Sequence, residues 1–251
     1  MIVAQGAKGS EPRPVMITLW DRLVEHDGPF RFRLPGPLTP AEVVERLEAG
    51  GEPGSLGLPP EDVLAALAWA GLGPPGSLGP ALIQQPPKRP RLAPALAEPA
   101  LVALLPRAHR GRVLALSAGL LLIHDFWSAS HAAAQTAEDQ GERDFSAYWH
   151  GIAHRREPDA SNAAYWFRRV GRHPLLATLG ELARPILEEA GDERWVSRLL
   201  EGGSWNPMAM IEFATGADRS AHQEALLRRL QRLEMQLLLD ATATAAMGDS
   251  A

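Results

Sequence analysis

HRGRVLALSAGLLLIHDFWSASHAAAQTA, residues 109–137, decides the fold, because its apolar and small residues recur with helical periodicity. From residue 95 onward nearly all of the chain continues this pattern, with short Gly, Pro or Asp breaks. We predict helices near residues 97–104, 109–137, 144–156, 160–170, 175–190, 192–201, 206–215 and 220–246. The sequence therefore predicts an all-helical bundle domain over residues 95–251, with its long first and last helices packed together.

A smaller unit is predicted at residues 16–73. Thr39 can cap a helix in which Pro40 takes the first position and Glu42 reaches back to the cap. A second helix begins near residues 58–62 and ends at the glycines of residues 71–73. Ahead of both, PFRFRLPG (29–36) alternates apolar and basic residues and predicts a short strand or hairpin arm.

Two other segments have compositions that disfavour regular structure. Residues 1–15 are expected to be a disordered tail. The segments GPPGSLGP (73–80) and QQPPKRPRLAP (84–94) predict a Pro-rich linker over residues 74–94. The basic residues of this linker are interpreted as solvated charge rather than as a nucleic-acid contact.

Composition excludes several chemistries. The chain has 251 residues, 45% of them hydrophobic, and no cysteine, so disulfides, thiolate zinc sites and cysteine nucleophiles are absent. Any metal must be held by histidine and carboxylate. The net charge of -5 disfavours a broad nucleic-acid surface. The longest apolar run, Val113–Ile123, covers about half of a membrane span, so we expect no membrane partner and a cytoplasmic protein.

Histidines recur at spacings that suit a site. His124, Ser128, His131 and Gln135 fall at i, i+4, i+7 and i+11 of the helix expected at 109–137, and this polar stripe is expected to face the interior. In the next helix, His150 and His154 lie one turn apart, and Glu157 continues their face. A histidine pair at this spacing can chelate one divalent ion.

The metal hypothesis has a geometric limit. His124 and His131 would be about 10.5 Å apart along a helix, so only one of them is expected to join His150 and His154. We take His131 as the third ligand and His124 as its alternative. Two other interpretations stay open. His150, His154 and Glu157 could transfer protons without a metal, or the histidines could only specify helix packing through hydrogen bonds.

A second polar face follows in the same region. Asn162, Tyr165 and Arg169 share one side of the helix expected at 160–170, and Arg168 and Arg172 lie close to it. Guanidinium groups beside hydroxyl and amide groups suit capture of a carboxylate or phosphate. These residues predict binding of a small anionic molecule. The alternative is that the arginines pair with acids of the bundle such as Glu181, Glu188 and Glu212.

Two family resemblances accompany these patterns. LTPAEVVERLEAGGEPGSLGLPPEDVLAALAWAG resembles a winged-helix-like family of unknown function related to VapB-type antitoxins, which implies a small DNA- or protein-binding unit. HDFWSASHAAAQ, YWHGIAHRREPDASNAAYWFRRVGRHP and SWNPMAMIEF resemble an uncharacterised helical family of bacteria and fungi with a Trp-His-x-x-x-His-Arg-Arg-Glu run. The second resemblance implies a shared site without an established reaction.

Three functions fit the sequence. The first is an enzyme or ligand-binding protein with a histidine site, with or without one divalent ion as cofactor, and with a small anionic ligand. The second is an antitoxin-like regulator or adaptor that binds DNA or a protein partner. The third is an interaction module whose polar cluster is structural. Whether the protein is an enzyme stays open, and the leucines of the last helix also allow a homo-oligomer.

Overall fold

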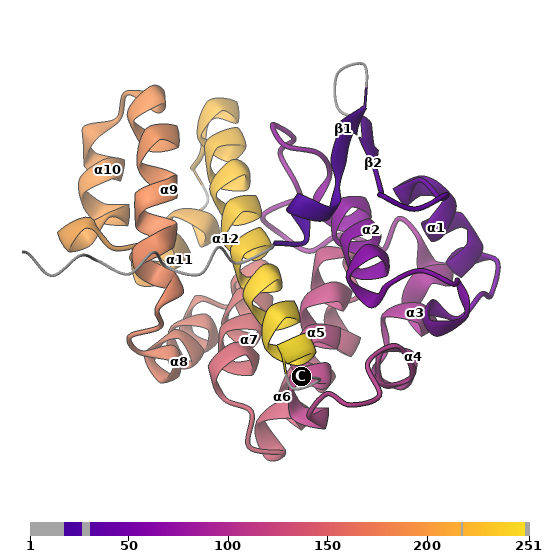
Figure 1. The fold of residues 1–251 in the computed structure, drawn as a ribbon. Coiled ribbons are helices and arrows are strands. Elements are labelled where there is room, and N and C mark those ends of the chain that lie inside the picture. The colour runs from indigo at the N-terminus through magenta and orange to yellow at the C-terminus, as the bar shows by residue number, and fades with distance from the viewer. Residues whose placement is uncertain (1–17, 27–30, 217, 249–251) are drawn as a thin grey trace, which may run out of the picture.

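The computed structural model describes residues 18–26, 31–216 and 218–248, and it is mostly α-helical, as the sequence predicts (Figure 1). The expected tail at residues 1–15 lies outside the described residues. The α-helices are α1 (Pro40–Glu48), α2 (Pro60–Leu72), α3 (Ala93–Leu96), α4 (Glu98–Leu104), α5 (Arg110–Ile123), α6 (Trp127–Asp139), α7 (Asp144–Arg156), α8 (Ala160–Val170), α9 (Leu175–Ala190), α10 (Glu193–Leu199), α11 (Pro207–Thr215) and α12 (Ala221–Gly248). Short 3-10 helices cover Trp20–Arg22, Pro53–Ser55, Pro90–Leu92 and Glu201–Gly203.

The N-terminal elements are a hairpin followed by two helices. Strand β1 (Val24–His26) pairs antiparallel with β2 (Arg31–Arg33), so the strand expected within residues 29–36 is confirmed. The expected capping box of α1 is also confirmed: the Thr39 side chain accepts from the Glu42 N–H, and the Glu42 carboxylate accepts from the Thr39 N–H at 2.7 Å. Helix α2 packs against α1. The winged-helix-like relationship stays a prediction.

The structure corrects the expectation of one helix over residues 109–137. The helix ends at Ile123, and a separate helix, α6, begins at Trp127 and packs against α5. Asp125 has a left-handed backbone with φ of 67°. Arg156 stabilises the break, because its guanidinium donates to the Leu122 carbonyl at 2.8 Å and to the Asp125 carboxylate at 2.6 Å. The helical periodicity of the sequence does not predict this break, because the hydrogen bonds that stabilise it come from Arg156, which is distant in the chain.

The break also overturns the predicted polar stripe. His124 is buried at the end of α5, whereas Ser128 and Gln135 on α6 are exposed. A single helical periodicity does not run through the two helices. Of the four residues in the stripe, His131 alone lies beside the histidines of α7.

The Pro-rich segment 74–94 is held against the helices. Side chains from α7 and α12 donate to three consecutive carbonyls of this segment: Arg228 to Gly79 and Pro80, and both Arg156 and Gln231 to Ala81. Leu82 is buried, and the segment ends in the short helices at residues 90–96. These contacts fix the path of the chain between α2 and α4.

Two large apolar clusters make up most of the core of the described residues, and a small third cluster consists of Leu114, Ala115 and Ala137. The larger joins α1 and α2 to α5, α7 and the C-terminal half of α12, so the N-terminal helices and the bundle share buried side chains. The second large cluster joins α9, α10 and α11 to the N-terminal half of α12. Helix α12, yellow in Figure 1, crosses the molecule and contacts both α5 and α9, which includes the expected packing of α5 on α12.

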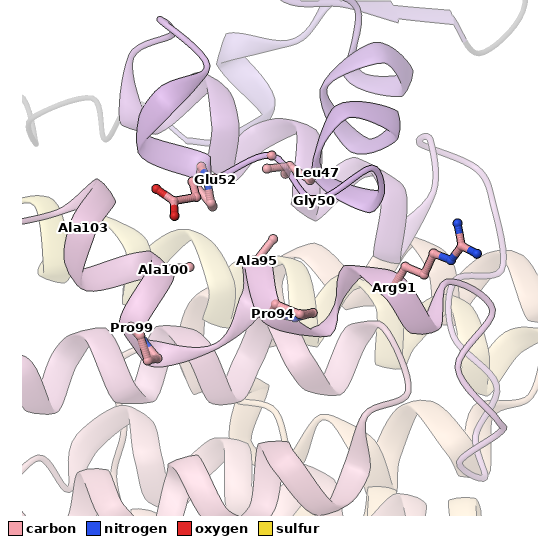
Figure 2. Close-up of a pocket in the computed structure, with 11 residues that line it drawn as sticks. Leu47, Gly50, Glu52, Arg91, Pro94, Ala95, Pro99, Ala100 and Ala103 are labelled. Atoms are coloured by element: carbon pink, nitrogen blue, oxygen red, sulfur yellow. The ribbon is translucent and has the colours of Figure 1, made fainter.

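A surface pocket separates the N-terminal helices from α3 and α4 (Figure 2). Its volume is about 380 Å³, and its walls are mostly small apolar residues, among them Leu47, Ala95 and Ala100. Glu52 and Arg91 lie at its two ends (Figure 2). No histidine lines this pocket. Within the described part of the chain, no helix combines the length and apolar character needed to cross a membrane.

Candidate metal centre

Helices α6 and α7 bring three histidines together. His150 and His154 lie one turn apart on α7, as their spacing predicts, and His131 lies on α6. Each of the three residues offers one ring nitrogen as a ligand atom, and these three atoms all lie within 4.8 Å of one another. The ring centroids are 4.3 Å apart for His131 and His150, 5.1 Å for His131 and His154, and 5.0 Å for His150 and His154.

The arrangement of the rings suits convergence of nitrogen atoms on one point. The imidazoles of His150 and His154 stack on one another, and His131 meets both of them edge-on. His150 is 1% exposed and His154 is 4% exposed, whereas His131 is half-buried. The cluster therefore lies below the surface and reaches it beside His131.

Tryptophans line two sides of the cluster. The indole of Trp166 stacks on His150 with 3.8 Å between ring centroids, and that of Trp127 stacks on His131 at 5.0 Å. The Trp127 N–H donates to the Ala153 carbonyl at 2.8 Å, which fixes the indole against α7. The sequence patterns do not assign Trp127 to the site, although its position four residues before His131 places both residues on one face of α6.

Glu157 orients His154. Its carboxylate lies 2.8 Å from Nδ1 of His154, so the other ring nitrogen, Nε2, is left to face a ligand. A carboxylate on the outer nitrogen of a histidine fixes the tautomer and raises the basicity of the inner nitrogen. The amide nitrogen of Asn162 lies 3.5 Å from the same Nδ1. His154, Glu157 and Asp159 form a second group with closely placed ligand atoms, but the Asp159 carboxylate also caps α8.

Among the described residues, no carboxylate belongs to the group formed by His131, His150 and His154. The Nδ1 atom of His150 is buried, and no described residue forms a hydrogen bond with it. Burial, followed by the neighbouring rings of His131 and His154, lowers the pKa of His150 to about 3. Burial and His154 also lower the pKa of His131. These two imidazoles are therefore neutral at pH 7, which is the form that binds a metal.

His124 does not belong to this cluster. Its ring is buried against α2, where Nε2 lies 3.0 Å from the Leu67 carbonyl. Burial lowers the pKa of His124 to about 4, so the neutral ring donates this hydrogen bond. His124, the alternative third ligand in our sequence prediction, thus joins α5 to α2. The groups that could hold a metal in the described part of the chain do not include it.

The arginine face lies at the margin of the cluster. Arg169 pairs with Glu138 of α6, and its guanidinium lies 5.4 Å from the ring centre of Trp166 and 5.8 Å from that of Tyr165. The Trp166 indole thus contacts both His150 and Arg169. Tyr165 is 48% exposed, and Arg168 and Arg172 are exposed as well. The expected partners of the arginines did not include Glu138.

Arg155 and Arg156 of α7 are buried, unlike the exposed Arg168, Arg169 and Arg172. The Arg155 guanidinium lies 2.5 Å from the Glu234 carboxylate of α12. Both side chains are fully buried, and Glu234 also accepts from Tyr148 and Trp205. Arg156 stabilises the break after α5. Arg155 and Arg156 hold α7 against the neighbouring elements, and they are inaccessible to a ligand.

Comparison of the chain with protein-family models, curated proteins and solved structures found no match. The two family resemblances seen in the sequence therefore stay predictions. The geometry of the histidines is the basis for the function proposed below.

Proposed function

We propose that this protein is a metal-dependent enzyme in which His131, His150 and His154 hold one divalent transition-metal ion. The observation that carries the proposal is the convergence of three histidine ligand atoms from two helices within 4.8 Å of one another. Imidazole nitrogen suits zinc, and also copper, iron and nickel. Zinc bound by three histidines is typical of catalytic sites.

The surroundings of the histidines support this proposal. Neutral His131 and His150 require no loss of a proton before they bind an ion. Glu157 holds His154 in one orientation, as the partners of ligating histidines do in metal sites. The Trp127 and Trp166 indoles restrict the movement of His131 and His150. The sequence interpretation of His150, His154 and Glu157 as catalytic is thus refined: the histidines bind the ion and Glu157 orients one of them.

An ion with three protein ligands keeps a further position for water or substrate, where it acts as a Lewis acid. His131 is half-buried, whereas His150 and His154 are buried, so we expect this position to face the surface on the side of His131. We assign the protein a hydrolytic or hydration reaction at a carbonyl or phosphoryl centre, since these reactions need only Lewis-acid catalysis and an activated water. Nothing in this assignment requires cysteine or lysine, in agreement with the composition.

The expected substrate is a small molecule with an anionic group. Arg169 is an exposed arginine at the margin of the cluster, since it packs on the Trp166 ring that covers His150. Arg169 already has Glu138 as a partner, so an anion must displace this carboxylate or share the guanidinium with it. Asn162 on the first turn of α8 offers an amide beside His154. Arg168, Arg172 and Tyr165 complete an exposed rim.

The metal is tested on protein purified without immobilised metal and stripped with a chelator. Isothermal titration with zinc, cobalt, nickel and manganese should show one site per chain for at least one of them. Binding should raise the melting temperature, because an ion at about 100 times its Kd stabilises the native state by about 2.7 kcal/mol. His131→Ala, His150→Ala and His154→Ala should each abolish this rise.

His222→Ala is the matched control, because His222 is exposed near the start of α12. It should bind the ion like the parent. Since His150→Ala also removes a buried ring, His150→Gln and circular dichroism are needed to separate lost binding from lost folding. Retention of the parent stoichiometry and affinity by two of the three alanine variants would contradict the proposal.

A further inference from the structure

A second place in the molecule has the geometry of a binding surface: the outer edge of β2. In the described part of the chain, β2 has β1 as its single strand neighbour. In an antiparallel pair, alternate residues direct their N–H and C=O groups away from the partner strand. These groups are available for a further strand. The edge borders a cleft of about 410 Å³ that also contacts the start of α1 and Trp69 of α2.

The cleft combines apolar walls with two positive charges. Phe32, Pro40, Ala41 and Trp69 supply apolar surface. Arg31 and Arg33 are exposed, and they point to the same face of β2 because they lie two residues apart. Within the described residues, neither guanidinium has a carboxylate partner within ion-pair distance, although the chain as a whole is negative.

We propose that the β2 edge binds an extended peptide of a partner protein, with the pattern acidic, apolar, acidic. The peptide adds to β2 as a third strand. Its two acidic residues lie opposite Arg31 and Arg33, and the apolar residue between them lies opposite Phe32 and contacts the cleft. Main-chain hydrogen bonds supply affinity in this mode of recognition, and alternate side chains supply specificity. Two opposite-charge pairs across strands select the acidic sequence.

The same edge suits a peptide better than a nucleic acid. Proteins that bind DNA commonly neutralise several phosphates, whereas this cleft has two arginines. Exposed Glu25 lies on β1 opposite Phe32, and exposed Glu42 and Glu45 lie on α1, so a continuous phosphate backbone would meet negative charge on either side. A short peptide strand would contact only the β2 edge and would not extend to these acidic residues. Arginines on a free edge also oppose pairing between two copies of this protein.

The test uses the full chain and a fluorescein-labelled peptide, Ser-Thr-Glu-Val-Glu-Thr-Ser, in fluorescence anisotropy. The parent should bind it about tenfold more tightly than Ser-Thr-Lys-Val-Lys-Thr-Ser, as expected for two charge pairs. The double variant Arg31→Glu/Arg33→Glu should reverse this preference. Methylation of the backbone nitrogens of the acidic peptide should weaken its binding to the parent by about tenfold or more, because it removes the hydrogen-bond donors to β2.

A matched control is Arg107→Glu/Arg143→Glu, which changes the net charge equally at exposed arginines outside the cleft. It should keep the preference of the parent. Melting temperatures show whether each variant is folded, and reversal of preference cannot result from unfolding. The proposal is overturned if the parent does not prefer the acidic peptide, or if Arg31→Glu/Arg33→Glu keeps the same preference. It is also overturned if the parent instead binds duplex DNA with a steep salt dependence that this variant abolishes.

Discussion

Substitution of Glu234 by glutamine tests the support beneath the histidine cluster. Glu234 and Arg155 are fully buried, their charged groups are 2.5 Å apart, and Nε and Nη1 of Arg155 have no hydrogen-bond partner among the described residues. Glu234→Gln therefore leaves a buried guanidinium without a counter-charge. Loss of one partner of a buried ion pair costs about 3 to 5 kcal/mol. For a domain of this size, about 1 kcal/mol shifts the melting temperature by about 2 to 4 °C, so we expect a decrease of about 6 to 20 °C.

The assay is unfolding by denaturant and by heat, with circular dichroism as the signal that reports the folded fraction. Glu189→Gln is the control, because Glu189 of α9 forms an exposed ion pair with Arg229 of α12, the helix that also carries Glu234. Loss of this exposed pair should leave the melting temperature close to that of the parent. The double variant Arg155→Met/Glu234→Leu removes both buried charges and should be more stable than Glu234→Gln. The reasoning is refuted if Glu234→Gln and Glu189→Gln melt at the same temperature, or if the double variant is the least stable of all.

Three further predictions concern packing, protonation and the Pro-rich segment. Gly119→Ala should lower the free energy of unfolding by about 1 to 3 kcal/mol, because the new Cβ would lie 2.6 Å from the buried Trp149 ring. Gly54→Ala, with its nearest neighbour at 3.4 Å, is the control, and equal stabilities in urea titrations would contradict this account. Burial raises the pKa of Asp240 from 3.8 to about 7, so the folded state takes up a proton as the pH falls from 7 to 5 and the cost of the buried charge is lost. Relative to Asp240→Asn, the parent should therefore gain about 2 kcal/mol of unfolding free energy over this range, and parallel pH profiles of the two proteins would show that the carboxyl does not titrate there. Arg156→Lys keeps the charge but cannot reach the Ala81 and Leu122 carbonyls and Asp125 together, so it should accelerate trypsin cleavage after Lys88 in the native protein, whereas Arg143→Lys should leave the rate unchanged.

Much of the fold follows from local sequence signals. Prolines, glycines and capping residues mark the ends of α7, α8, α9 and α11 closely, because these signals act within a few residues of each helix end. The break between α5 and α6 does not follow from them. It depends on Arg156, which lies 31 residues from Asp125 in the chain. A periodicity argument cannot detect a contact of this kind.

The candidate site shows the same division. The spacing of His150 and His154 places both on one face of α7, and the expectation of a single further histidine agrees with the geometry around His131. The reason for that expectation was wrong, since His124 and His131 lie on different helices. Burial of Arg155 and Arg156 could not be inferred, because their partners Glu234 and Asp125 are distant in sequence. An arginine-rich run does not reveal which guanidinium groups face solvent.

The most direct test of the metal proposal is a crystal structure of the protein soaked in zinc, with anomalous diffraction data collected on both sides of the zinc absorption edge. We predict one anomalous peak about 2.0 to 2.1 Å from a nitrogen of each of His131, His150 and His154. A peak at other residues, or three ordered imidazoles with no peak between them at a zinc concentration that saturates the parent in titration, would contradict it.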